Sequence, residues 1–143
     1  MRADLAQRCV RILVDRPAGS TLVSFAGSPR FTAPTFLTVQ VDATTHLQPE
    51  PVFLECVNHS CAPNVAFDME RFALVAVTDL KAGDELVYFY PSTEWQMAQP
   101  FSCACAAPGC LGLIDGASGL SDVQLSRYAL SPFVKSQLRA RSG

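Results

Sequence analysis

Asn58-His59-Ser60-Cys61-Ala62-Pro63-Asn64 places two amides, an imidazole, a thiol and a proline side by side in a short stretch. Pro63 blocks a helix and restricts Ala62 to extended backbone, and both asparagines favour turns. Apolar runs flank the stretch at residues 52–57 and 65–67. The pattern predicts a polar loop held between buried elements, which is a common way to build a site. Taken alone, the loop is also compatible with an ordinary turn that carries a spare thiol.

Length and composition indicate a single globular domain. The chain has 143 residues, of which 49% are hydrophobic and 17% charged, so it can form a core without cross-links. A formal net charge of −2 gives no basic surface, and we expect no direct nucleic-acid binding. No apolar run is long enough to cross a membrane, and charges interrupt the N-terminal residues, so we expect neither a membrane span nor a signal peptide.

The same features predict an intracellular protein, without deciding between cytoplasm and nucleus. Thiols stay reduced inside cells. The six cysteines therefore suggest metal binding or packing before disulfides.

Short strands and loops are predicted for most of the chain, followed by helices. We expect strands over residues 9–14, 21–25, 36–41, 72–77 and 85–90, with loops over residues 26–34 and 42–51. Ser121 and Ser131 are suited to cap two short helices, the second with Pro132 in its first turn. The predicted fold class is therefore mostly β with short C-terminal helices.

Cys103-x-Cys105-x4-Cys110 is a second informative motif. Zinc takes four tetrahedral ligands, usually thiolate or imidazole, and this cluster supplies three. Cys61 in the polar loop is the natural candidate for the fourth. The two histidines are weaker candidates, since neither has a metal-like spacing. Unligated thiols or a local disulfide remain the alternative.

The third motif is Gly83-Asp84-Glu85-Leu86-Val87-Tyr88-Phe89-Tyr90. On a strand, Tyr88 and Tyr90 would face the same side. Two phenols directed at one place are compatible with core packing, with cross-strand contacts, or with the lining of a narrow channel. The strand alone leaves these three readings open.

In their order and spacing, the three motifs resemble the SET domain of protein-lysine methyltransferases with its post-SET cysteines. The similarity extends over residues 8–114, and residues 90–101 look most like small stand-alone SET proteins of fungi and other microbes. The resemblance implies a SET domain at residues 1–100, a post-SET zinc segment at 101–114 and a helical tail at 115–143. It also implies small curved β-sheets with a pseudoknot, in which the C-terminal segment threads under a loop.

The resemblance assigns roles to individual residues. Tyr90 becomes the catalytic tyrosine, and Tyr88 takes the position that controls how many methyl groups fit. The implied zinc ligands are Cys61, Cys103, Cys105 and Cys110. The implied cofactor is S-adenosylmethionine, and the residues expected to bind or cover it are Arg8, Asn58, His59, Trp95, Phe101 and Leu111.

The residue types suit this chemistry. A lysine amine, with a pKa of about 10.4 in water, must be neutral to accept a methyl group. Burial and a nearby sulfonium lower that pKa, and an aromatic channel excludes water and aligns the reacting atoms. The Tyr90 hydroxyl can orient the amine.

The chain also departs from the family. Gln7-Arg8-Cys9 stands where the family has a Gly-x-Gly that lets the backbone approach the cofactor closely. The insert between residues 41 and 51 is very short, and substrate grooves of the family depend on that insert.

We therefore expect an S-adenosylmethionine-dependent N-methyltransferase acting on a lysine side chain of a protein or peptide, histones included. Two alternatives remain open. One is a SET-fold enzyme recruited to a small molecule in microbial secondary metabolism, and the other is a catalytically degenerate, zinc-stabilised binding module. A homodimer that completes the surface is compatible with so small a protein.

Overall fold

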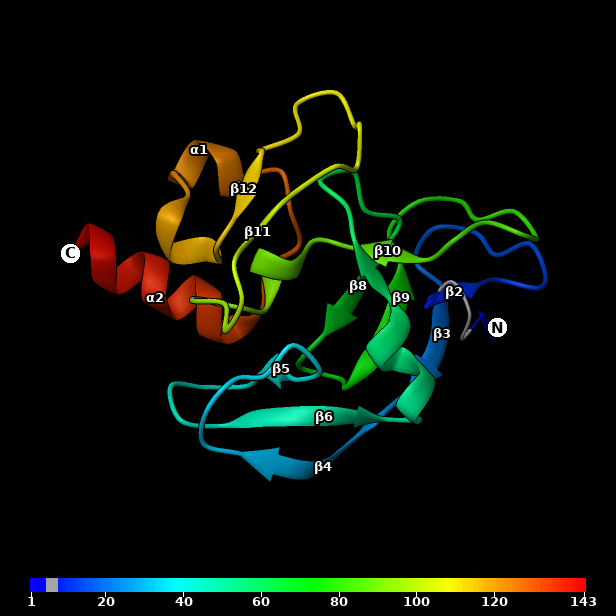
Figure 1. Cartoon of the computed structure of the whole chain (residues 1–143), viewed down its shortest axis with the longest axis horizontal. Helices are drawn as coiled ribbons and strands as arrows, with labels where there is room; N and C mark the ends of the chain where they lie inside the picture. The colour runs from blue at the N-terminus through cyan, green and yellow to red at the C-terminus, as the bar shows by residue number, and fades with distance from the viewer. Residues whose placement is uncertain (5–7) are drawn as a thin grey trace.

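In the computed structural model, which describes residues 1–4 and 8–143, five small β-sheets lie beside a helical C-terminal part (Figure 1). Two antiparallel three-stranded sheets form the larger part. One has the order β3-β9-β8, with bounds Thr21–Ser24, Ala73–Ala76 and Val65–Asp68. The other has the order β4-β6-β5, with bounds Ala26–Phe31, His46–Glu50 and Val39–Gln40.

The remaining three sheets are two-stranded. The antiparallel pairs are β1 (Arg2–Asp4) with β2 (Cys9–Arg11), and β11 (Phe101–Ser102) with β12 (Leu113–Ile114). The parallel pair is β7 (Asn58–His59) with β10 (Val87–Tyr88). Short 3-10 turns cover Val52–Cys56, Tyr90–Ser92 and Ala117–Gly119, and the helices are α1 (Asp122–Leu125) and α2 (Pro132–Ser142).

The polar loop at residues 58–64 holds the segment that follows residue 84. The Ser60 N–H donates to the Tyr88 carbonyl at 3.0 Å, and the Asn64 N–H donates to the Val87 carbonyl at 3.1 Å. The Asn64 side chain accepts from the Val87 N–H at 2.9 Å and donates to the Glu85 carbonyl at 2.8 Å. An asparagine thus takes the place of a neighbouring strand, and the hydrogen bonds tie residues 85–88 to the polar loop.

Two hydrophobic clusters share the segment around Tyr88. The first fills the space between the sheets and includes Leu47, Leu74 and Tyr88. The second lies under the C-terminal helices and contains Phe89, whose ring stacks on Tyr128 at a centroid distance of 3.6 Å. Consecutive residues of an extended segment point to opposite sides, so Tyr88 and Phe89 enter different clusters and join them.

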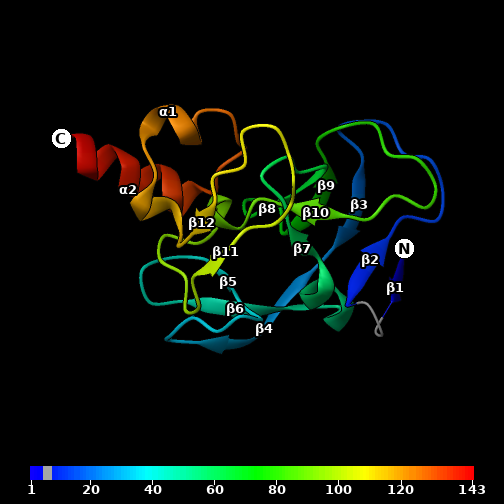
Figure 2. The same ribbon diagram turned by 45° about the horizontal axis from the view of Figure 1, so that its top comes forward.

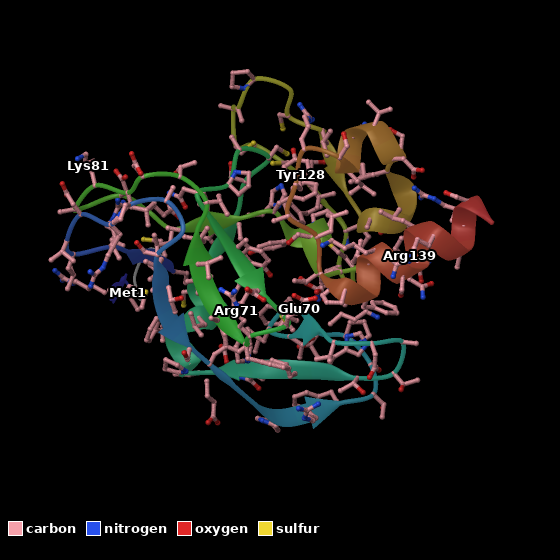
Figure 3. The ribbon with its side chains drawn as sticks, turned by 180° about the vertical axis from the view of Figure 1, so that it is seen from behind. Met1, Glu70, Arg71, Lys81, Tyr128 and Arg139 are labelled. Carbon is pink, nitrogen blue, oxygen red and sulfur yellow. The ribbon has the colours of Figure 1, made fainter. Side chains whose placement is uncertain are left out.

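The helical tail agrees with its sequence. Ser121 caps α1 with a reciprocal capping box to Gln124, and Ser131 caps α2 ahead of Pro132. Figure 2 shows the tail at one end of the molecule and β1 and β2 at the other. Seen from behind, Met1 and Arg139 again lie at opposite ends (Figure 3). In the part of the chain that the structure describes, no helix combines the length and apolarity that a bilayer crossing requires.

Three secondary-structure predictions were wrong. Residues 26–34 and 42–51 were expected to be loops because of their Gly, Pro and polar content, yet they contain the paired strands β4 and β6. A register shift between Gly27 and Arg30 accommodates Pro29 on what is an edge strand. The predicted strand over residues 85–90 ends at Tyr88, because Tyr90 opens a 3-10 turn together with Pro91.

Candidate active site and zinc centre

Tyr88 and Tyr90 border a cavity of about 310 Å³. Its walls come from five segments of the chain, around Arg8, Phe36, Cys56, Tyr90 and Gln99. The two tyrosine rings lie 4.7 Å apart between centroids. The two phenols therefore meet at one place although the strand ends between them, because the 3-10 turn carries Tyr90 back toward Tyr88.

Both tyrosines are neutral at physiological pH. Burial raises the pKa of Tyr90 to about 12, and it raises the pKa of Tyr88 well above its ordinary value with the help of neighbouring Tyr90 and Glu94. The Tyr90 hydroxyl donates to the Val57 carbonyl at 3.3 Å. The pair can therefore donate and accept hydrogen bonds at the cavity, but neither phenol is a base.

His59 connects the catalytic candidate to the cysteines. Its Nδ1 accepts the Tyr90 backbone N–H at 3.1 Å, which leaves the proton on Nε2, 3.4 Å from the Cys61 sulfur. Burial lowers the pKa of His59 to about 4, so the ring is neutral. The His59 ring thus spans from Cys61 to the backbone of Tyr90 and also contacts Phe101, at 5.6 Å between centroids.

Asn58 ties the N-terminal part of the chain to the cavity. Its side-chain NH2 donates to the Arg8 carbonyl at 2.8 Å and to the Glu85 carboxylate at 3.1 Å. Arg8 has a left-handed backbone, with φ of 49°, and lines the cavity. Gln7, the first residue in place of the family's Gly-x-Gly, lies outside the described residues.

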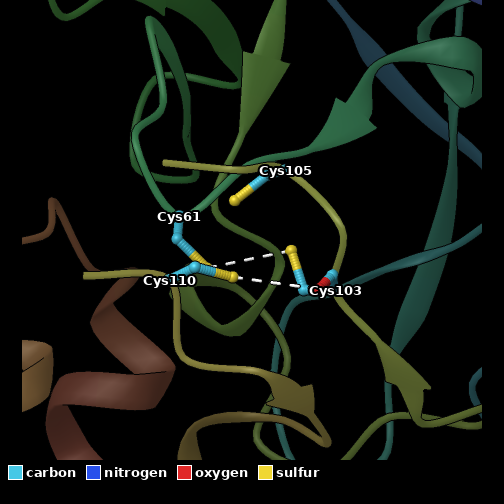
Figure 4. Close-up of side chains that lie close together, drawn as sticks. All are labelled: Cys61, Cys103, Cys105 and Cys110. Carbon is cyan, nitrogen blue, oxygen red and sulfur yellow. Dashed lines mark hydrogen bonds between the residues drawn. The ribbon is translucent and has the colours of Figure 1, made fainter. Parts of the chain in front are cut away.

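The four predicted zinc ligands lie together. The sulfurs of Cys61, Cys103, Cys105 and Cys110 are all within 4.8 Å of one another (Figure 4). Cys61 lies 4.0 Å from Cys103 and 3.9 Å from Cys110, whereas tetrahedral zinc with bonds of about 2.3 Å needs sulfurs about 3.8 Å apart. These separations fit a zinc ion and not a disulfide.

The thiols differ in how readily they ionise. Burial raises the pKa of the Cys61 thiol to about 12, so a cation is needed to hold it as a thiolate. The pKa of Cys105 is lowered to about 6, first of all by the backbone N–H of Cys61. The Leu111 N–H also points to the Cys61 sulfur at 3.5 Å. Cys61 comes from the polar loop and the other three thiols from residues 103–110, so zinc would join these two segments.

The predicted site residues are only partly brought together. Arg8, Asn58, Tyr88, Tyr90 and Phe101 all line the cavity, and His59 supports its wall. Trp95 and Leu111 pack instead against the second hydrophobic cluster, with Arg141 over the Trp95 ring at 5.6 Å. The cofactor contacts assigned to individual residues stay predictions.

The cavity also contains two carboxylates that the sequence had not indicated. Glu94 is only 6% exposed, and burial raises its pKa to about 7. Glu55 is partly exposed and accepts a hydrogen bond from the Gln48 side chain. Nothing in the sequence marks Glu94 as a site residue, because its burial depends on the fold around it.

Comparison with known proteins shows to which family the chain belongs. The SET domain family model matches residues 7–91, more than half of the chain. "Methyltransferase flvH" of Aspergillus flavus is 40% identical over 133 residues, covering 92% of this chain and 74% of that protein. "Histone-lysine N-methyltransferase, H3 lysine-36 specific" of Aspergillus oryzae is 38% identical over 65 residues, 41% of this chain and 7% of that protein.

A solved structure shows the same fold. It is described as "crystal structure of KRYPTONITE in complex with mCHG DNA and SAH", with a TM-score of 0.58 and 24% identity. The match covers 73% of this chain and 26% of that one, so the chain spans only a small part of its larger relatives.

The chain belongs to the SET domain family. It is a SET-domain methyltransferase, and S-adenosylmethionine is the cofactor of this class. The cysteine quartet has the composition and spacing of a zinc site.

Proposed function

We propose that the protein transfers a methyl group from S-adenosylmethionine to the amine nitrogen of a lysine side chain in a protein. The observation that carries this is the cavity in which two neutral tyrosines meet a buried carboxylate. When bound, S-adenosylmethionine would supply a methyl group on a positively charged sulfur, and the lone pair of the substrate amine would accept that methyl group.

The chain's own residues would prepare the amine. Burial beside the Tyr88 and Tyr90 rings would hold the amine closer to its uncharged form. Tyr90 is held from two sides, through its backbone to His59 and through its hydroxyl to Val57. A hydroxyl fixed in this way can orient the amine lone pair, and misplacement of about 1 Å is enough to cost about 100-fold in rate.

A second candidate is the amine of a free small molecule. It is favoured by the connection between β5 and β6, where Val41 donates to the Thr45 carbonyl at 2.9 Å and closes a tight turn. A turn of this length offers little surface for gripping a peptide on either side of a lysine. The cavity chemistry is the same in both candidates.

The test is transfer of a labelled methyl group by the zinc-loaded protein to histone peptides, unrelated lysine peptides and small primary amines. We expect Tyr90→Phe to lower kcat/KM about 100-fold while zinc content and cofactor binding are kept. Thr78→Val is the control, because it removes an exposed hydroxyl that does not line the cavity. An active Tyr90→Phe variant, or no cofactor binding by the wild type, would refute the proposal.

A further inference from the structure

Glu94 is placed on the cavity by the turn that also places Tyr90. The Glu94 N–H donates to the Tyr90 carbonyl at 3.1 Å, so the two residues are one turn apart. Both side chains line the cavity together with Tyr88. A carboxylate therefore lies beside the two phenols, in a position that solvent hardly reaches.

The side-chain hydrogen bonds of Glu94 involve only one of its two carboxylate oxygens. Oε2 accepts from the Gln40 N–H at 3.0 Å and from the Thr93 hydroxyl at 2.6 Å. Among residues 1–4 and 8–143, neither a hydrogen bond nor an ion pair reaches Oε1. A buried carboxylate with no cationic partner is costly. Two donors fix one oxygen while the other is left for something that enters the cavity.

Glu55, the other carboxylate on this cavity, lacks these properties. It is partly exposed, and it is engaged by the Gln48 side chain. An exposed carboxylate interacts with a cation through high-dielectric solvent and contributes little. Glu94 is the group whose burial makes such a contact strong.

We infer that Glu94 recognises the ammonium group of the substrate and receives its proton before methyl transfer. This inference rests on the proposed function and deepens it, because it names an alkylammonium as the group recognised. A cation entering next to Oε1 would form a charge-assisted hydrogen bond in a dry environment. The same chemistry holds for a lysine side chain and for a free primary amine.

The proton step is balanced within the cavity. An N–H bond of the ammonium breaks with its electron pair staying on nitrogen, and an O–H bond forms on the Glu94 carboxylate. The amine is then neutral with a free lone pair, and the proton later leaves to water through the cavity mouth. Burial raises the pKa of Glu94 to about 7, so the group can hold or release a proton near neutral pH.

Binding of simple amines tests the inference without relying on turnover. Calorimetry on the zinc-loaded protein, with and without S-adenosylhomocysteine, would use n-pentylammonium, Nα-acetyl-lysine N-methylamide and the neutral 1-pentanol. Glu94→Gln keeps an acceptor for Gln40 and Thr93 but removes the charge. Glu70→Gln is the matched control, since it removes a carboxylate from an exposed position outside the cavity.

We expect Glu94→Gln to weaken both ammonium ligands about 10- to 100-fold and to leave 1-pentanol unchanged. Binding of the ammonium ligands within threefold of wild type would overturn the inference. If Glu94→Gln weakens binding of the lysine amide more than binding of pentylammonium, the ammonium group recognised belongs to a protein lysine. If it weakens pentylammonium binding more, the group belongs to a free amine. Methyl transfer that survives Glu94→Gln unchanged would refute only this inference. Intact Glu94-dependent binding without any methyl transfer would refute only the proposed function.

A measurement on the wild-type protein tests the inference even if Glu94→Gln does not fold. Binding an ammonium ion to a protonated Glu94 must expel its proton, so nearly one proton is released at pH 6 and almost none at pH 8. Heats measured in buffers of different ionisation enthalpy count these protons. Absence of release at pH 6 would overturn the inference. The ionisable groups around Glu94 are Arg8, Glu55, Cys56, Tyr88 and Tyr90 on the cavity, with Asp42 and His46 beside Gln40.

Discussion

Replacing Glu94 with glutamine is expected to remove a pH-dependent cost of folding. The carboxyl has a pKa of about 7 in the fold against an ordinary value of 4.5, because it is buried. The folded state therefore binds the proton more tightly than the unfolded state. The stability that this group contributes is present below about pH 4.5 and is lost as the pH rises to about 7.

The size of the effect follows from the two pKa values. The interval between 4.5 and about 7 corresponds to about 3 kcal/mol of unfolding free energy. The free energy of unfolding of Glu94→Gln should therefore rise relative to wild type by about 3 kcal/mol between pH 4.5 and pH 8. The buried His59, whose pKa is lowered to about 4, produces the opposite slope in both proteins and cancels in the difference.

Urea unfolding of both proteins at half-unit pH intervals, with zinc present, measures this difference. The pH profile of the unfolding free energy of Glu70→Gln should be parallel to that of the wild type, because the Glu70 carboxylate is exposed. Two parallel profiles for Glu94→Gln and wild type would refute the reasoning, since they would show that Glu94 titrates as it does in the unfolded chain.

Three further perturbations follow from the packing and the zinc site. Phe89→Ala should destabilise the fold by about 3 to 5 kcal/mol in chemical unfolding, because the ring is 2% exposed and stacked on Tyr128. Gly116→Ala should cost about 2 kcal/mol or more in the same assay, because a Cβ would lie 2.5 Å from the Trp95 carbonyl at a φ of 110°. Chelation of zinc should raise hydrogen exchange over residues 101–114 while β3, β8 and β9 stay protected; unchanged exchange there would argue against a metal link.

The loop and the cysteine quartet could be predicted from the sequence because the residue types themselves indicate a turn and a set of metal ligands. Pro63 and the two asparagines favour a turn by themselves, and a zinc ion needs four thiolate or imidazole ligands wherever they come from. Three thiols in residues 103–110 leave one ligand to find, and Cys61 stands in the other polar motif. Motifs of this kind can be recognised without knowledge of the fold.

The strands β4 and β6 could not be predicted in the same way. Their residues are poor in the usual strand formers, and they become strands because each is hydrogen-bonded to the other across the sheet. Strand formation depends on such partners more than on the residues themselves. Glu94 was missed for the same reason, since nothing in the sequence separates a buried glutamate from an exposed one until Gln40 is placed beside it.

Backbone hydrogen bonds at residues 94 and 95 determine where the Trp95 side chain packs. The Ala117 N–H donates to the Glu94 carbonyl and the Ser118 N–H to the Trp95 carbonyl, both at 2.9 Å. These bonds hold residues 94–95 against the turn after Gly116, so the indole packs with the C-terminal cluster while Glu94 faces the cavity. Glu94 and Trp95 are adjacent in the sequence, yet one lines the cavity and the other packs against the second hydrophobic cluster.

The zinc site, the cavity and the tail are coupled through a few contacts. His59 bridges the Cys61 sulfur and the Tyr90 backbone, and the Tyr128 hydroxyl donates to the Cys61 carbonyl at 2.8 Å. Tyr128 in turn stacks on Phe89, the residue between the two cavity tyrosines. The Cys61 loop is therefore linked to Tyr90 by two sets of contacts, the imidazole and the stacked rings. A zinc ion bound at Cys61 would fix this loop, and with it the backbone against which the proposed catalytic hydroxyl is held.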